Sequence, residues 1–255
     1  MTAARIIKPP LPDRIRTKWH RFGSWLARLP LGADTPQRYL FIVTYGRTGS
    51  TLLQKLLGSI PGVYVAGENH NSLHGAFLAW QNATILKQKY GWGHETIDHP
   101  WHGADAADPD AYARDMVKAF VAHVLRPPRG KTTVGFKEIR YLTDDLRDYL
   151  LFIDRFLGPA IFVINTRSVD EVAQSAWWKD ADRDQLAANV ARFESISDAL
   201  VAEFPDRFVK IDYARWTTDP EALRPVYKML DAPFDPATIA DTLSVRLEHM
   251  RGPNK

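Results

Sequence analysis

The sequence contains no cysteine among its 255 residues. Disulfide bonds are therefore excluded, as are zinc and iron–sulfur sites that depend on thiolate ligands. No apolar run approaches the ~20 residues that a membrane-spanning helix needs. Basic and proline residues also interrupt every candidate for the apolar core of an N-terminal signal peptide. We expect a cytoplasmic protein in which any membrane association involves the N-terminal extension.

Positive charge is concentrated in residues 1–36, which we interpret as a basic N-terminal extension. Residues 1–30 hold seven of the 33 lysines and arginines but one of the 30 acidic residues, so the rest of the chain is slightly acidic. A nucleic-acid partner is not expected, because its signature is a basic surface on the folded body. The segment 14–29 mixes bases with aromatic residues. It predicts a helix that contacts a membrane surface or partner, or one that docks on its own domain, which we favour.

Residues 37–255 predict a single α/β domain with a central parallel sheet flanked by helices. Short apolar segments with little polar alternation are typical of parallel strands buried on both faces. The predicted strands are Tyr39–Tyr45, Val63–Ala66, Thr133–Lys137, Ala160–Thr166 and Phe208–Asp212. Two predicted helices begin near Ser50 and at Asp108-Pro109. The other predicted helices cover Thr143–Leu157, Ser168–Trp178, Asp184–Phe204, Asp219–Leu230 and Asp235–Leu247. Residues 90–110 break this rhythm and predict a long surface loop.

A glycine-rich, cationic turn follows the first strand, in the stretch FIVTYGRTGSTLL. The start of a helix presents unpaired N–H groups and a partial positive charge, so it attracts anions. Two glycines let the backbone curl around a ligand, while an arginine and two hydroxyls add further donors. The turn therefore predicts a phosphate-binding loop at the carboxyl end of the strand. Its residues are Gly46, Arg47, Thr48, Gly49, Ser50 and Thr51.

The loop differs from the loop that binds nucleoside triphosphates. That motif reads G-x-x-x-x-G-K-[ST], with a lysine directly after the second glycine. Here the cation, Arg47, precedes the second glycine, and no strand ends in a convincing magnesium-binding aspartate. These differences count against a kinase that uses ATP, which we keep as an alternative, together with a non-catalytic nucleotide-binding protein of the same fold.

The segment GRTGSTLL resembles the 5′-phosphosulfate-binding loop of sulfotransferases that use 3′-phosphoadenosine 5′-phosphosulfate (PAPS), especially the tyrosylprotein, trehalose and carbohydrate sulfotransferases. FVINTRSVDEVAQSAWWK resembles their 3′-phosphate element, in which a strand ends in an arginine and a serine follows eight positions later. Arg167 and Ser175 are the matching residues. The resemblance implies a P-loop nucleoside-kinase-like sulfotransferase fold, PAPS as the donor and no metal.

Three further segments resemble parts of the same family. VYVAGENHN carries the Gly-Glu pair whose glutamate is the catalytic base in tyrosylprotein sulfotransferases, which implies this role for Glu68. GFKEIR places Lys137 on a lysine that assists transfer of the sulfuryl group in the same enzymes. IDYARWTTDP aligns Tyr213 with a tyrosine of the donor site. This last pattern departs from the family at Ala214 and Arg215, so a core or capping role for Tyr213 stays equally open.

The acceptor is expected to bind an insertion at about residues 69–130, which is rich in tryptophan and histidine. Aromatic faces and short polar groups suit a carbohydrate or glycolipid hydroxyl, the acceptor we favour, but they also suit phenols. The stretch HETIDHPWH lacks the His-x-x-x-His spacing of a zinc enzyme. His70 and His74 have that spacing, but Asn71 stands where the zinc motif has glutamate. No metal site is expected.

Overall fold

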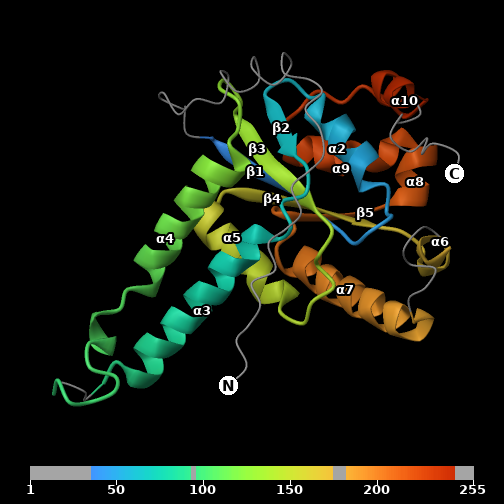
Figure 1. Cartoon of the computed structure of the whole chain (residues 1–255). Helices are drawn as coiled ribbons and strands as arrows, with labels where there is room; N and C mark the ends of the chain where they lie inside the picture. The colour runs from blue at the N-terminus through green and yellow to red at the C-terminus, as the bar shows by residue number, and fades with distance from the viewer. Residues whose placement is uncertain (1–35, 93–95, 175–181, 245–255) are drawn as a thin grey trace, which may run out of the picture.

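The computed structural model describes residues 36–92, 96–174 and 182–244 (Figure 1). Five parallel strands form one sheet in the order β2-β3-β1-β4-β5. The strands are β1 (Arg38–Val43), β2 (Val63–Ala66), β3 (Thr133–Glu138), β4 (Ala160–Thr166) and β5 (Phe208–Asp212). This architecture confirms the predicted α/β domain with a parallel sheet. The predicted N-terminal extension lies outside the described residues, apart from Pro36.

Helices connect the strands and cover both faces of the sheet. The α-helices are α2 (Ser50–Gly58), α3 (Ser72–Tyr90), α4 (Pro109–Phe120), α5 (Leu146–Leu157), α6 (Val169–Ala173), α7 (Arg183–Glu203), α8 (Tyr213–Thr218), α9 (Arg224–Met229) and α10 (Pro236–Ser244). Shorter turns of helix are η1 (Ala104–Ala106), η2 (Val121–Leu125) and η4 (Pro220–Leu223).

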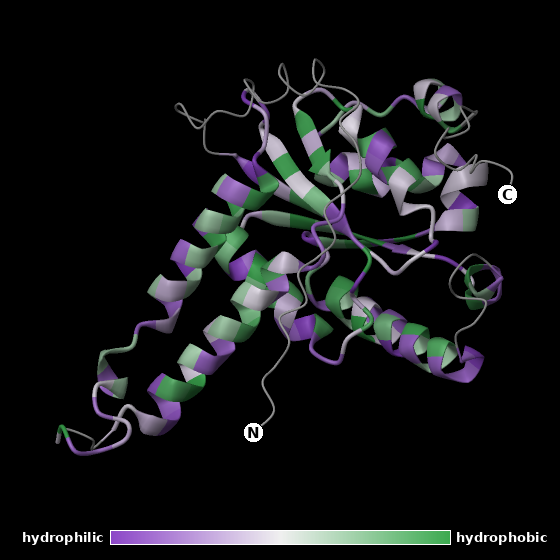
Figure 2. Ribbon diagram, in the orientation of Figure 1, coloured by the Kyte–Doolittle hydropathy of each residue, from purple (hydrophilic) through white to green (hydrophobic). Residues whose placement is uncertain are grey.

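The central strand β1 separates two apolar cores, because alternate side chains of a strand point to opposite faces. Phe41 and Val43 pack in the core that includes α3, α4, α5 and α7. Leu40 and Ile42 pack in the core that includes α2, α8, α9 and α10. The hydropathy colouring shows the strands as largely apolar and the helices as two-sided (Figure 2). Because the five strands are parallel, their carboxyl ends lie at one edge of the sheet, between the two cores.

Helix boundaries differ from the prediction in three places. α3 forms over 19 residues where no helix was predicted, because only Leu73 and Phe77 of that helix are buried and its apolar face is weakly marked. The segment predicted as one helix from Asp219 divides into η4 and α9, since Pro225 lacks the N–H that would continue the first turn. The short helix α8 was not predicted; it follows β5 directly, with Asp212 as its cap.

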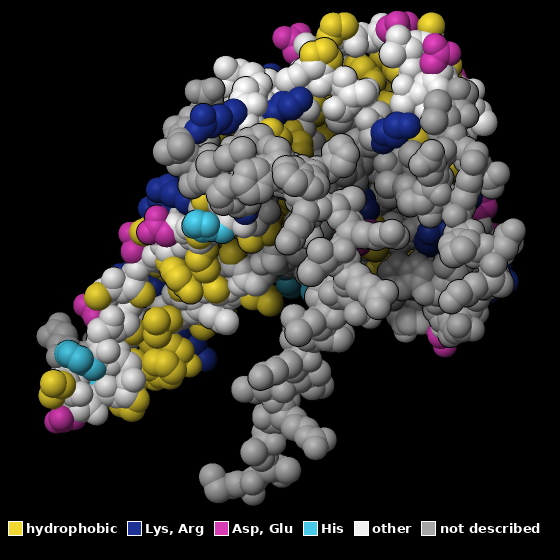
Figure 3. Space-filling view, turned by 45° about the horizontal axis from the view of Figure 1, so that its top comes forward, with side chains coloured by type: hydrophobic (Ala, Val, Ile, Leu, Met, Phe, Trp, Pro, Cys, Tyr) yellow, Lys and Arg dark blue, Asp and Glu magenta, His cyan; other side chains and the backbone are white. Residues whose placement is uncertain are grey.

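Helices α3 and α4 project together from the body as an arm (Figure 1), and the short turn η1 is the described helical element between them. Hydrophobic side chains are spread over the visible surface of this arm (Figure 3). Among the described residues, the large hydrophobic side chains that are exposed all lie on the arm or at its base: Leu78, Ile85, Trp92, Ile97, Trp101, Tyr112 and Val124. In the described part of the chain, no helix is both long and apolar enough to cross a membrane.

Candidate functional site

The carboxyl ends of the five parallel strands meet at one edge of the sheet. β1 lies at the centre, and the chain leaves it toward β2 on one side before crossing to β4 on the other. Such a switch in direction opens a crevice, which is where parallel α/β sheets bind ligands. Lys137 lies near the carboxyl end of β3, and the segments that follow β1, β2, β4 and β5 carry the other described residues that the sequence predicted for the site.

The glycine-rich loop turns sharply between β1 and α2. Gly49, which precedes the helix, has φ 74°, and Arg47 has φ 72°, so both lie in the left-handed region. A Cβ atom at Gly49 would lie 2.1 Å from Cε2 of Tyr213. Glycine is therefore required here both by the backbone conformation and by the close approach of the tyrosine ring. The loop backbone is held against α8, with the exposed Arg47 side chain beside it.

Buried polar side chains brace the loop from beneath. The Thr44 hydroxyl donates to the carbonyl oxygen of Asn165 at 2.6 Å and lies 2.6 Å from the Thr48 hydroxyl. The Asn165 amide donates to the carbonyl oxygen of Thr48 at 2.8 Å and accepts from the Trp216 indole at 2.8 Å. The Thr48 hydroxyl is thus engaged inside the protein.

Arg167 lies directly beside the loop, at the end of β4. Its guanidinium stacks 4.4 Å from the centre of the Tyr213 ring and donates to the Arg47 carbonyl oxygen at 3.0 Å. The Tyr45 hydroxyl fixes its backbone by accepting from its N–H and donating to its carbonyl oxygen. Burial raises the pKa of Tyr45 to about 12, so its phenol stays protonated and can donate. The predicted donor residues Arg47, Gly49, Arg167 and Tyr213 are therefore neighbours, while Ser175 lies outside the described residues.

The predicted base and its neighbouring cation also meet. Lys137, in β3, donates to Oε1 of Glu68 at 2.5 Å, although 69 positions separate them in the chain. The lysine side chain is 6% exposed and the glutamate side chain 35% exposed. Glu68 follows β2, which pairs with β3, and β3 pairs in turn with β1. The ion pair therefore stands at the same edge of the sheet as the anion loop.

A second carboxylate, Glu138, lies directly after Lys137 and is completely buried. Arg140 donates to it at 2.8 Å and also lies 3.5 Å from Oε2 of Glu68. Burial raises the pKa of Glu138, but hydrogen bonds from the N–H groups of Ile139 and Asn71 and from Arg140 outweigh burial and set it below its ordinary value. Glu138 and Arg140 belong to the segment GFKEIR, but the sequence alone predicts no role for them.

The described histidines near the site do not suggest a metal centre. His74 bonds Asp145 through Nε2 at 2.8 Å, and His70 is exposed. Within the described ranges, no three His, Asp or Glu side chains are grouped as metal ligands would be. The cations of the site are instead arginine and lysine side chains. A glycine-rich loop at the start of a helix, with a carboxylate and these cations at the same edge of the sheet, is suited to the transfer of an anionic group to a hydroxyl.

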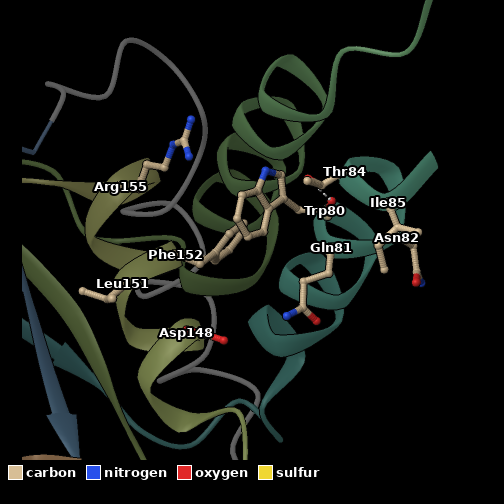
Figure 4. Close-up of a pocket in the computed structure, with 9 residues that line it drawn as sticks. All are labelled: Trp80, Gln81, Asn82, Thr84, Ile85, Asp148, Leu151, Phe152 and Arg155. Atoms are coloured by element: carbon tan, nitrogen blue, oxygen red, sulfur yellow. Dashed lines mark hydrogen bonds between the residues drawn. The ribbon is translucent and has the colours of Figure 1, made fainter. Parts of the chain in front are cut away.

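A cavity of about 480 Å³ lies between α3 and α5, at the base of the arm (Figure 4). The rings of Trp80 and Phe152 form its apolar wall, with their centres 5.4 Å apart. Both helices also contribute polar side chains to the lining (Figure 4). They are Gln81, Asn82, Thr84, Asp148 and Arg155. The cavity combines an aromatic surface with several hydrogen-bonding groups, as ligand sites commonly do.

Residues 40–236 match the family model described as "Sulfotransferase family". The sulfotransferase domain of the Synechococcus PCC 7002 olefin synthase is similar in fold, with a TM-score of 0.50, 18% identity and coverage of 86% of this chain and 81% of that one. The sulfotransferase STF1 of Mycobacterium tuberculosis gives a TM-score of 0.42 and 15% identity, covering 89% of this chain and 74% of that one. No curated protein matches the sequence.

Proposed function

The chain belongs to the sulfotransferase family, and from that premise we propose that it moves a sulfuryl group from PAPS to a hydroxyl of a carbohydrate or glycolipid. One observation carries the proposal: the Glu68–Lys137 pair and the Arg47 loop stand at the same edge of the sheet. The first supplies a proton acceptor for a hydroxyl, and the second supplies a cradle for a phosphosulfate. A transfer enzyme needs both at one place.

The donor would lie with its 5′-phosphosulfate on the loop. The N–H groups at the start of α2 and the guanidinium of Arg47 would bind its oxygens. The hydroxyl of Thr51 is exposed in the first turn of α2 and would add a donor, whereas Ser50 is buried and would contribute chiefly its N–H. Gly46 and Gly49 keep the backbone free of side chains at the closest approach.

The 3′-phosphate would bind at Arg167, whose guanidinium already lies beside the loop. The Tyr213 ring supports that guanidinium from one side and so limits its freedom. Glu171 pairs with its Nε at 2.7 Å and the Arg47 carbonyl oxygen accepts from its Nη1, so Nη2 would contact the phosphate. We extend the phosphate site to Ser175, which lies outside the described residues.

In the proposed reaction the acceptor oxygen attacks sulfur while the bond from sulfur to the bridging phosphate oxygen breaks. Glu68 takes the hydroxyl proton, and 3′,5′-bisphosphoadenosine (PAP) leaves with the electron pair of that bond. Arg47, Lys137 and the loop N–H groups stabilise the charge that grows on the leaving phosphate. Lys137 pairs with Glu68 in this structure. During transfer Lys137 would contact the phosphosulfate as well, and this shared contact would hold Glu68 close to the donor.

The acceptor would enter from the side of α3. This helix starts directly after the segment that carries Glu68, and the cavity at Trp80 lies about 12 Å further along it, from the rise of 1.5 Å per residue. We assign the cavity to a part of the acceptor remote from the reacting hydroxyl. Its aromatic wall and polar rim favour a sugar ring over a simple phenol.

The proposal predicts transfer of label from radioactive PAPS to a sugar or glycolipid, without added metal and in the presence of a chelator. A panel of sugars, glycolipids and phenols is incubated with the full chain, and labelled acceptors are separated from the donor. Matched reactions with ATP labelled at its γ-phosphate and with magnesium test the kinase alternative. Phosphorylation in these reactions, or PAP binding without any sulfated product, would overturn the assignment in favour of one of its two alternatives.

A further inference from the structure

β3 holds the segment around Glu68 from two directions. Successive side chains of a strand point to opposite faces, so Lys137 and Glu138 leave β3 on opposite sides. Lys137 binds the Glu68 carboxylate itself. Glu138 binds the backbone directly behind it, by accepting from the N–H groups of Asn69 at 3.2 Å and Asn71 at 2.8 Å. The candidate base is therefore fixed through its side chain and through its chain neighbours by two adjacent residues.

Both carboxylate oxygens of Glu138 are fully used. Oε2 accepts the two N–H groups of the segment 69–71, and Oε1 accepts the N–H of Ile139 at 2.8 Å and Nη1 of Arg140 at 2.8 Å. Four donors converge on one buried anion that is 0% exposed. Such charge-assisted hydrogen bonds are among the strongest in proteins, and an isolated carboxylate is too costly to bury without them.

The segment that Glu138 binds has an unusual backbone. His70 has φ 59° and Asn71 has φ 55°, both in the left-handed region that residues with a side chain rarely adopt. Immediately afterwards α3 begins, with the N–H of Ser72 donating to the Asn69 side chain at 2.9 Å. Two consecutive residues in this conformation need an external constraint. The Glu138 carboxylate, which accepts the N–H of Asn71, supplies it.

Arg140 links the buried carboxylate to the candidate base. Its Nη1 lies 2.8 Å from Oε1 of Glu138 and 3.5 Å from Oε2 of Glu68. The Arg140 guanidinium is thus held mainly by Glu138. Its longer distance to Glu68 lets it orient that carboxylate without forming a close hydrogen bond to it. If Glu138 lost its charge, Glu68 would be the remaining carboxylate beside Arg140.

We propose that Glu138 is a positioning residue for sulfuryl transfer: it fixes residues 69–71 and Arg140 so that the Glu68 carboxylate faces Lys137 and the incoming hydroxyl. Glu138 itself is buried and touches neither donor nor acceptor. The inference rests on the proposed function, because it assumes that Glu68 accepts the proton. It adds a residue that acts on the reaction through the base alone.

Glu138→Gln tests this inference. The amide replaces one carboxylate oxygen with a donor. Depending on how the side chain turns, either the N–H groups of Asn69 and Asn71 or those of Ile139 and Arg140 lose their acceptor. We expect kcat for the acceptor found with labelled PAPS to fall by about 10- to 100-fold, the effect of a small misplacement at a reacting group. The melting shift produced by PAP should stay close to that of the parent, because the loop and Arg167, which would hold its two phosphates, lie after β1 and β4. Glu138→Asp keeps the charge and should lose less activity. It replaces Glu138→Gln in the test if the glutamine variant does not fold.

Asp154→Asn is the matched control. Its carboxylate is 9% exposed and pairs with Arg207, close to the start of β4 and thus at the opposite edge of the sheet. It should lower the melting temperature and leave kcat unchanged.

Glu68→Gln combined with Glu138→Gln separates positioning from general stability. If Glu138 acts through Glu68, the double variant should be no slower than Glu68→Gln alone. Rate losses that multiply, or an unchanged kcat in Glu138→Gln, would overturn the inference while leaving the proposed function intact. A parental rate in Glu68→Gln would instead overturn the assignment of the base, and this inference with it.

Discussion

Glu68→Gln is expected to lower kcat by about 100- to 10,000-fold, the usual contribution of a positioned general base. The variant removes the proton acceptor but keeps the size of the side chain, and its amide oxygen can still accept from Lys137. Because the base acts in the transition state, affinity for PAP should hardly change. The measurement is kcat with the identified acceptor, together with the PAP melting shift of the same preparation.

Glu203→Gln is a suitable control for this prediction. Glu203 also pairs with a cation, Arg147 at 2.7 Å, but it ends α7 shortly before β5 begins, away from the carboxyl edge. Its loss should leave turnover unchanged. A Glu68→Gln variant that turns over within about threefold of the parent, against the general-base expectation, would move the role elsewhere. His74 would then be the next candidate, since it lies near the start of α3 and its imidazole bonds Asp145.

Arg47→Ala should weaken PAP binding by about 10- to 100-fold, the cost of losing hydrogen bonds to a charged group. It should also lower kcat by about 100- to 1,000-fold, because Arg47 would stabilise the leaving phosphate as charge develops. Alanine keeps a Cβ atom at φ 72°, so the strain of the loop is that of the parent. Calorimetric titration with PAP and steady-state kinetics measure the two effects separately.

Arg47→Lys should retain part of both properties, since one positive charge remains but the planar fork of donors is lost. Arg224→Ala is the control for loss of a surface arginine; this side chain pairs with Glu221 on the turn before α9, away from the loop. If Arg47→Ala binds PAP as tightly as the parent, the loop does not hold the 5′-phosphosulfate and the donor must be placed elsewhere.

The sheet was predictable because its signals are local. Each strand is a short apolar segment bounded by turn residues, and the positions of all five agree with the structure to within two residues. α3 was missed because the core packs against little of it, so its apolar periodicity is faint. The tryptophans of this region were noted, but the cavity that Trp80 lines depends on α5, which lies far away in the chain.

The site was predictable only in part, because its contacts join residues that lie far apart in the chain. Arg47, Glu68, Lys137 and Arg167 each belong to a recognisable segment, but no segment shows that Lys137 and Glu68 bind one another. Glu138 looks in the sequence like an ordinary charged residue at the end of a strand. Its significance appears only when the N–H groups of Asn69 and Asn71 are seen to fold back onto it, 69 and 67 positions away. Asn165 is similar, since its partners come from the loop and from α8.

Thermal unfolding of the full chain with PAP, AMP and ATP tests whether PAPS is the donor, and it needs no acceptor. The residues at the loop and at Arg167 predict a site that requires both phosphates of PAP. At 100 times its dissociation constant, PAP should stabilise the chain by about 2.7 kcal/mol, and AMP at the same concentration should stabilise it far less. Magnesium should not alter the PAP shift. Equal shifts with AMP and PAP, or a larger shift with ATP and magnesium, would contradict the assignment of PAPS as the donor.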